Sequence, residues 1–238
     1  MKLITKQIPN SITAANLLMG CLAIISALNH ELIQASYFIG LAAIFDFFDG
    51  FAARLLKVHS EIGKQLDSLA DVVSFGVAPG MIFYIHSCFV NEAAHQPEYF
   101  SYLAFLIPIF SAFRLAKFNL DTRQTDSFIG LPTPANALFI CSIPLVYEQG
   151  PEFANTFFSS QLFCYLFPFV SSWLLMAELP LFALKFKHFK WNGNQIRWIF
   201  IGLSLVNLIA FNYFGISLSI LLYLTLSIYL FYTQKNEI

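Results

Sequence analysis

Apolar runs separated by short polar stretches recur along the whole chain of 238 residues. An α-helix needs about 20 apolar residues to cross a bilayer, and most of these runs reach that length. The pattern therefore predicts an all-α fold, a polytopic membrane helix bundle with about eight transmembrane helices. The expected spans cover residues 11–28, 32–56, 64–90, 100–118, 132–147 and 157–186, with two more in 196–232 on either side of Asn212–Gly215.

Composition supports a membrane protein. Hydrophobic residues make up 58% of the chain and charged residues 11%, which leaves too little polar surface for a soluble domain of this length. The formal net charge of -1 gives no reason to expect a nucleic-acid partner. No linker interrupts the chain, so we expect one membrane domain over residues 1–238. Four cysteines lie singly in apolar segments, where small apolar fillers are more common than zinc ligands or disulfides.

Basic residues mark one side of the expected bundle. Because lysine and arginine accumulate in cytoplasmic loops, this distribution places both termini and the loop after residue 56 in the cytoplasm, with the chain in the cell (inner) membrane. The opposite loops hold Glu31, Glu92, Glu98, Glu148 and Glu152 but no lysine or arginine. The 13 basic residues are Lys2, Lys6, Arg54, Lys57, Lys64, Arg114, Lys117, Arg123, Lys185, Lys187, Lys190, Arg197 and Lys235.

Four carboxylates interrupt the apolar pattern between residues 46 and 71. Asp46 and Asp49 are three apart and Asp67 and Asp71 are four apart, so each pair shares one face of a helix. A turn near Ser60 would bring the two pairs together. Acids at membrane depth need compensation, and one arginine cannot neutralise four of them. Hard carboxylate oxygens suit Mg²⁺ or Mn²⁺, so the stretch predicts a divalent-cation site.

This stretch reads D-x-x-D-G-x-x-A-R-x8-G-x3-D-x3-D and resembles the signature of the CDP-alcohol phosphatidyltransferases, membrane enzymes that displace CMP from a CDP-linked donor with an alcohol. Residues 67–79, 113–119 and 128–136 look like the corresponding stretches of the phosphatidylserine synthase branch. The resemblance covers about residues 5 to 140. The last hundred residues match only in being hydrophobic, and Glu178 stands where a small or hydroxyl side chain is expected.

The resemblance implies transfer of a phosphatidyl group from CDP-diacylglycerol to L-serine, two divalent cations and a homodimer. Asp46, Asp49, Asp67 and Asp71 would then lie at the metals, with Asp71 also the base that takes the hydroxyl proton. The implied nucleotide pocket comprises Gly50, Ala53, Arg54 and Gly63. The serine carboxylate needs a cation, for which Arg114 is the candidate, with Asn119 just beyond it.

Other interpretations remain open at this point. The acids could form a structural charge network, or an ion relay in a transporter. Within the family, the acceptor could be glycerol phosphate or an inositol phosphate, and the donor an archaeal ether lipid. Asn10, Thr13 and Asn16 share one helix face and could bond a neighbouring helix or contribute to the nucleotide pocket.

Overall fold

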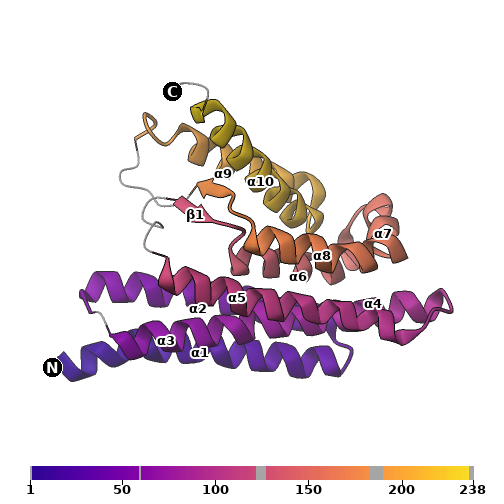
Figure 1. The fold of residues 1–238 in the computed structure, drawn as a ribbon, viewed down its shortest axis with the longest axis horizontal. Coiled ribbons are helices and arrows are strands. Elements are labelled where there is room, and N and C mark those ends of the chain that lie inside the picture. Colours follow the sequence, from indigo (N-terminus) through magenta and orange to yellow (C-terminus); the bar gives the residue numbers. More distant parts are fainter. Residues whose placement is uncertain (1, 59, 122–126, 183–189, 236–238) are drawn as a thin grey trace.

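A computed structural model describes residues 2–58, 60–121, 127–182 and 190–235 of the chain. Helices dominate it, with one short two-stranded sheet (Figure 1). In chain order the elements are α1 (Lys2–Leu28), α2 (Leu32–Leu56), α3 (Glu61–Asp71), a π-helix (Val72–Val77), α4 (Ala78–Ala93), a 3₁₀ helix (Glu98–Phe105), α5 (Leu106–Leu120), β1 (Ser127–Ile129), α6 (Thr133–Gln149), α7 (Glu152–Phe158), α8 (Gln161–Met176), β2 (Pro180–Phe182), α9 (Gln195–Phe211) and α10 (Phe214–Lys235).

The first five α-helices lie side by side, with α6 and α8 against them and the α9–α10 hairpin farther out (Figure 1). Small residues let α1 and α2 approach closely, because they bring the two backbones into van der Waals contact. They are Ala23, Ala27, Ala35 and Ala42, all fully buried. Larger side chains fill the core between α4, α5 and α6, including Phe75, Phe83, Ile107 and Ile140. This core fixes the helices whose other ends carry the acids.

The structure supports a membrane helix bundle, but not a count of eight spans. By length and composition, the described residues hold four helices able to cross a membrane, or five if α7 and α8 form one bent span. The four are Gln7–Leu28, Glu61–Ala93, Glu98–Leu120 and Phe214–Phe231. Of the other expected spans, α6 and α9 are too short, with only 17 residues each, and α2 is not among the four.

The expected span over residues 157–186 is also wrong. Here α7 and α8 meet at a bend of 73°, and α8 ends at Met176. The chain then becomes extended because β2 pairs antiparallel with β1, in the register Ser127 with Phe182 and Ile129 with Pro180. These two three-residue strands are a small departure from the all-α prediction.

Helix direction places the described basic residues at one end of the bundle. The ends of α2 and α5 and the starts of α1, α3 and α9 lie at this end, whereas the α1–α2 turn and α7 lie at the other (Figure 1). The acidic loop residues Glu31, Glu92 and Glu152 belong to the second end. The predicted separation of charge is therefore present in the fold. Arg123, Lys185 and Lys187 lie outside the described residues.

Candidate active site

The acid motif forms a helical hairpin whose turn is specified locally. Lys57 ends α2 in the left-handed conformation, with φ 51°. Its N–H donates to the Arg54 carbonyl, and the Val58 N–H donates to the Ala53 carbonyl, which is the Schellman pattern of a helix end. Ser60 then caps α3, because its Oγ accepts from the Gly63 N–H at 3.3 Å. The chain reverses within four residues and sets α3 beside the end of α2.

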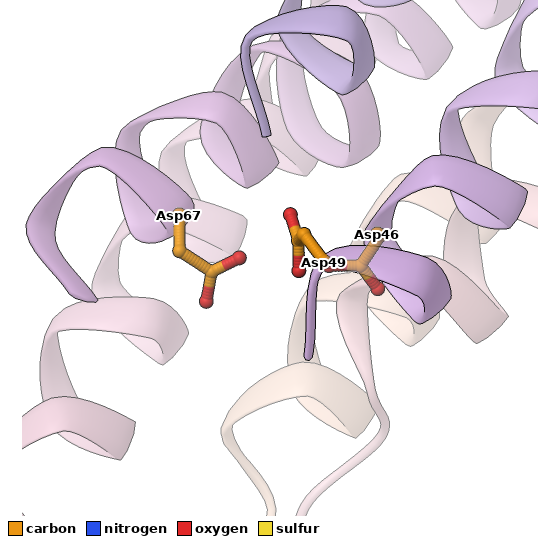
Figure 2. Close-up of side chains that lie close together, drawn as sticks. All are labelled: Asp46, Asp49 and Asp67. Carbon is orange, nitrogen blue, oxygen red and sulfur yellow. The ribbon is translucent and has the colours of Figure 1, made fainter. Parts of the chain in front are cut away.

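This reversal brings three of the four predicted metal ligands together. Asp46 and Asp49 on α2 face Asp67 on α3 (Figure 2), and one carboxylate oxygen from each lies within 4.8 Å of the other two. Asp49 is buried, with Oδ2 lacking a hydrogen-bond partner. Among the described residues none of the three carboxylates forms a salt bridge. Oxygen donors at this spacing, with a buried acceptor left unsatisfied, fit a hard divalent cation.

Asp71 lies one turn further along, at the last residue of α3, and is not among the three clustered carboxylates. It is buried, and the charge of Asp46 acts on it. Its Oδ1 accepts from Asn16 Nδ2 of α1 at 3.3 Å. The structure therefore places Asp71 next to the cluster and gives it a neutral partner of its own.

A cavity of about 220 Å³ opens beside Asp49 and Asp67. Three residues of the predicted nucleotide pocket line it: Gly50, Ala53 and Gly63. Arg54 is exposed and does not line this cavity, but its Nη1 lies 3.5 Å from where a Cβ on Gly50 would be. A Cβ on Gly63 would come within 3.0 Å of Asn10 Oδ1, so a larger residue would crowd the cavity wall.

Part of this cavity wall was not predicted from the sequence. Lys64, counted there only as a topology signal, lines the cavity together with Ser60 at the start of α3. A lysine and free N–H groups of a helix start are suited to phosphate oxygens. Asn10 and Thr13 also line it, whereas Asn16 faces Asp71 instead. Ser60, three residues before Gly63, is a helix-capping signal, and this signal could have been recognised from the sequence.

The two serine candidates differ in their surroundings. Arg114 on α5 is buried, its guanidinium lies over the Phe118 ring at 5.6 Å, and its Nε has no partner. Asp71 is among the charges that act on it. The hollow beside Arg114 holds about 10 Å³, room for about one water molecule, so serine does not fit there in this conformation. Asn119 instead joins α5 to α3, since its Nδ2 donates to Ser68 Oγ at 2.7 Å.

A larger cavity, of about 770 Å³, lies at the opposite end of the bundle. Its lining includes His30, Glu31, His86 and Tyr147. A single carboxylate there offers no cluster for a divalent cation. The smaller cavity is the better candidate for chemistry because it contains the acids.

Comparison with known proteins agrees with this geometry. The sequence profile described as CDP-alcohol phosphatidyltransferase matches residues 6–184, which include every residue of the acid motif and of its cavity. The chain belongs to the CDP-alcohol phosphatidyltransferase family. Because the chain belongs to this family of enzymes, the acids are not interpreted as the ion relay of a transporter. The match ends before α9, so the α9–α10 hairpin lies outside the family's shared part.

Curated relatives within the CDP-alcohol phosphatidyltransferase family point to one branch. The chain is 39% identical over 145 residues to a CDP-diacylglycerol–serine O-phosphatidyltransferase of Bacillus subtilis, covering 60% of this chain and 77% of the relative. A protein of that name from Helicobacter pylori strain 26695 is 32% identical over 203 residues, covering 83% and 80%. An archaetidylserine synthase of Methanothermobacter thermautotrophicus is 35% identical over 142 residues, covering 58% of each.

Proposed function

We propose that this protein transfers the phosphatidyl group of CDP-diacylglycerol to the hydroxyl of L-serine, giving phosphatidylserine and CMP. The observation that carries the proposal is the cluster of Asp46, Asp49 and Asp67, which opens into a cavity lined by the small residues of the same motif. The names of the relatives support serine as the acceptor. The protein acts in the cell membrane as a homodimer of one 238-residue domain, with the site and both termini facing the cytoplasm.

In this proposal the three clustered carboxylates and Asp71 hold two divalent cations, Mg²⁺ or Mn²⁺. When bound, these ions supply the positive charge that stabilises the attacking and leaving oxygens of phosphoryl transfer. Asp49 contributes an oxygen with no hydrogen-bond partner among the described residues, and Asp67 contributes from the facing helix. Within the described ranges, neither carboxylate has a salt bridge to break.

The cavity orients the donor. Gly50, Ala53 and Gly63 leave room for the cytosine and ribose, while Lys64, the start of α3 and Arg54 at the rim face the phosphates. Positioning of this kind accounts for much of the rate gain in phosphoryl transfer, because the protein supplies little covalent chemistry.

Asp71 takes the proton of the serine hydroxyl as the new bond from serine oxygen to the lipid phosphorus forms and the bond from that phosphorus to the CMP oxygen breaks. The serine carboxylate pairs with Arg114, the buried cation on which Asp71 acts. An acceptor held there brings its hydroxyl toward Asp71. Because the adjoining hollow is too small for serine, binding requires the end of α8 to move, where Leu175, Met176 and the following Ala177 line that hollow.

A phosphorylated acceptor would need several free cations beside the site. Lys117 is engaged with Glu178 at 3.1 Å, which leaves Arg114 as the buried cation near Asp71 in the described part of α5. This favours serine over glycerol phosphate or inositol phosphate. The archaeal relative favours a second donor, the ether-linked CDP-archaeol, with the same acceptor.

The test is CMP release by the purified protein in detergent with a panel of substrates. CDP-diacylglycerol and CDP-archaeol are each offered with L-serine, glycerol phosphate, inositol phosphate and no acceptor. We expect release that depends on serine, with phosphatidylserine identified by mass spectrometry. Faster release with glycerol phosphate or inositol phosphate would contradict the proposed acceptor, and a strict preference for CDP-archaeol would change the donor.

A further inference from the structure

Two polar residues of α1, one turn apart, have different surroundings. Thr13 lines the cavity beside the acids, but Asn16 does not. Asn16 is fully buried and donates from Nδ2 to Asp71 Oδ1 at 3.3 Å. An ionised carboxylate only accepts hydrogen bonds, so the amide nitrogen is the atom that faces it. Asn16 therefore contacts the predicted base and does not line the nucleotide pocket.

A second contact fixes the backbone of Asn16 against the same region. Ser74 of the π-helix donates from Oγ to the Asn16 carbonyl at 3.0 Å. Gly20, one turn after Asn16, makes this approach possible, because a Cβ at that position would lie 2.9 Å from Ser74 Cα. Two hydrogen bonds thus join one residue of α1 to Asp71 and to the turn that follows it.

Asp71 stands where the helix changes type. It is the last α-helical residue before the π-helix of Val72–Val77, in which the Ala78 N–H bonds to the Val73 carbonyl. A π-helix widens the turn and shifts the hydrogen-bonding pattern by one residue, and such segments often occur at functional sites. At this junction the hydrogen bond from Asn16 of α1 fixes the direction of the carboxyl group.

We propose that Asn16 is a positioning residue for Asp71. By holding Oδ1 it fixes the rotation of the carboxyl group and leaves Oδ2 to accept the proton of the serine hydroxyl. Asn16 itself neither gains nor loses a proton. This inference rests on the proposed function, in which Asp71 is the base.

The alternative is an interhelical hydrogen bond with no part in catalysis. One observation speaks against it: Asn16 Oδ1 is buried and has no hydrogen-bond partner in the part of the chain that the structure describes. An unsatisfied buried acceptor costs stability, so the residue is a poor choice for holding helices together. Its role is the hydrogen bond that its Nδ2 donates to Asp71.

The test is a double-mutant cycle between Asn16→Leu and Asp71→Asn, with serine-dependent CMP release as the readout. Leucine copies the branched shape of asparagine but has no donor. We expect Asn16→Leu to lower kcat by about 10- to 100-fold, the range for losing a partner that orients a functional group, with both KM values within about twofold. In the Asp71→Asn background the same change should cost less than about threefold, because residues that act through one another are not additive.

Ser26→Ala is the matched control. Ser26 is also buried in α1 and donates to Gln34 Oε1 at 3.2 Å, far from the acids. Its loss should leave kcat unchanged. Asn16→Ala provides the same comparison if the leucine variant does not fold, with retained CDP-diacylglycerol binding as the measure of folding.

Three results would overturn the inference: wild-type kcat in both Asn16 variants, equal losses in the two backgrounds, or a raised KM with kcat unchanged. Failure of the proposed function is separate, because it would appear as absent serine-dependent release in the wild type.

Discussion

At the scale of single residues, the acid cluster is held by the fold against its own repulsion. Asp49 and Asp67 come from different helices, and their oxygens lie within 4.8 Å of each other and of an Asp46 oxygen. Like charges this close destabilise the protein in the absence of cations. Removing one charge should therefore relieve the repulsion in the folded protein while abolishing the activity that depends on the cluster.

Asp49→Asn and Asp67→Asn test this directly. Each should lower CMP release by more than the roughly 10- to 100-fold that loss of a metal ligand's outer partner costs. The thermal midpoint of the metal-free variants in detergent should equal or exceed that of the wild type. Added Mn²⁺ should raise the midpoint of the wild type more than that of the variants, because a ligand stabilises only the state that binds it.

Glu92→Gln is the control for these two variants. Glu92 is exposed near the end of α4, away from the acid cluster. Its loss should change neither activity nor the response to Mn²⁺. Loss of stability in the metal-free Asp49 and Asp67 variants would contradict the account, because it would mean that the acids hold the fold together.

Arg114→Lys tests the acceptor site. Lysine keeps the charge but loses the planar fork that pairs with a carboxylate through two hydrogen bonds. We expect the KM for serine to rise about tenfold or more, with the KM for CDP-diacylglycerol within twofold, as loss of a charge-assisted hydrogen bond of about 1.5 kcal/mol or more implies. The measurement is initial-rate kinetics over both substrates.

Lys117→Gln is its counterpart on the same helix. Lys117 pairs with Glu178 at the surface, and exposed pairs contribute little. Serine kinetics should stay near wild type in this variant. If Arg114→Lys leaves them equally unaltered, Arg114 does not bind the serine carboxylate.

At the scale of elements, the close packing of the segment between β1 and α6 against the end of α8 depends on one glycine. Gly130 has φ +77°, and a Cβ there would lie 2.6 Å from the Leu175 carbonyl oxygen. Gly130→Ala should lower the free energy of unfolding by about 1–3 kcal/mol, the usual cost of forcing a side chain into this region. Thermal unfolding in detergent measures it.

Gly202→Ala serves as the comparison. Gly202 lies within α9 with open space around the position of a Cβ, so alanine should be neutral or raise stability by up to about 1 kcal/mol. Equal effects of the two substitutions would contradict the role assigned to Gly130.

Sequence patterns predicted elements best where local signals decide them. The limits of α2 were predicted as 32–56 and are found there, and the break near Asn212 is also present. By contrast, the end of α8 depends on pairing between strands about fifty residues apart. The close contact between Gly20 and Ser74 of the π-helix joins two separate segments, so no pattern along one segment shows it.

The same distinction holds within the site. Spacing was enough to predict that Asp46, Asp49 and Asp67 converge, because the periods of two helices and one turn fix it. The link from Asn16 to Asp71 requires the relative rotation of α1 and α3, which packing determines. The engagement of Asn119 with Ser68 could not be foreseen for the same reason.

At the scale of the whole molecule, charge separates the two ends of the bundle. We expect cysteines introduced at Glu92 and Glu152 to react with an impermeant reagent in intact cells, and cysteines at Lys57 and Lys190 to react only after permeabilisation. All four positions are exposed. The background must lack Cys21, Cys88, Cys141 and Cys164. Labelling of Lys57 and Lys190 positions in intact cells would reverse the proposed orientation.

The central claim is that carboxylates in this fold bind divalent cations for transfer of a phosphatidyl group to serine. Its most direct test is serine-dependent CMP release by wild-type protein treated with excess chelator and then supplied with Mg²⁺ or Mn²⁺. The account predicts that release stops in chelator, returns when either cation is added, and equals the phosphatidylserine formed. Full activity in excess chelator would contradict it.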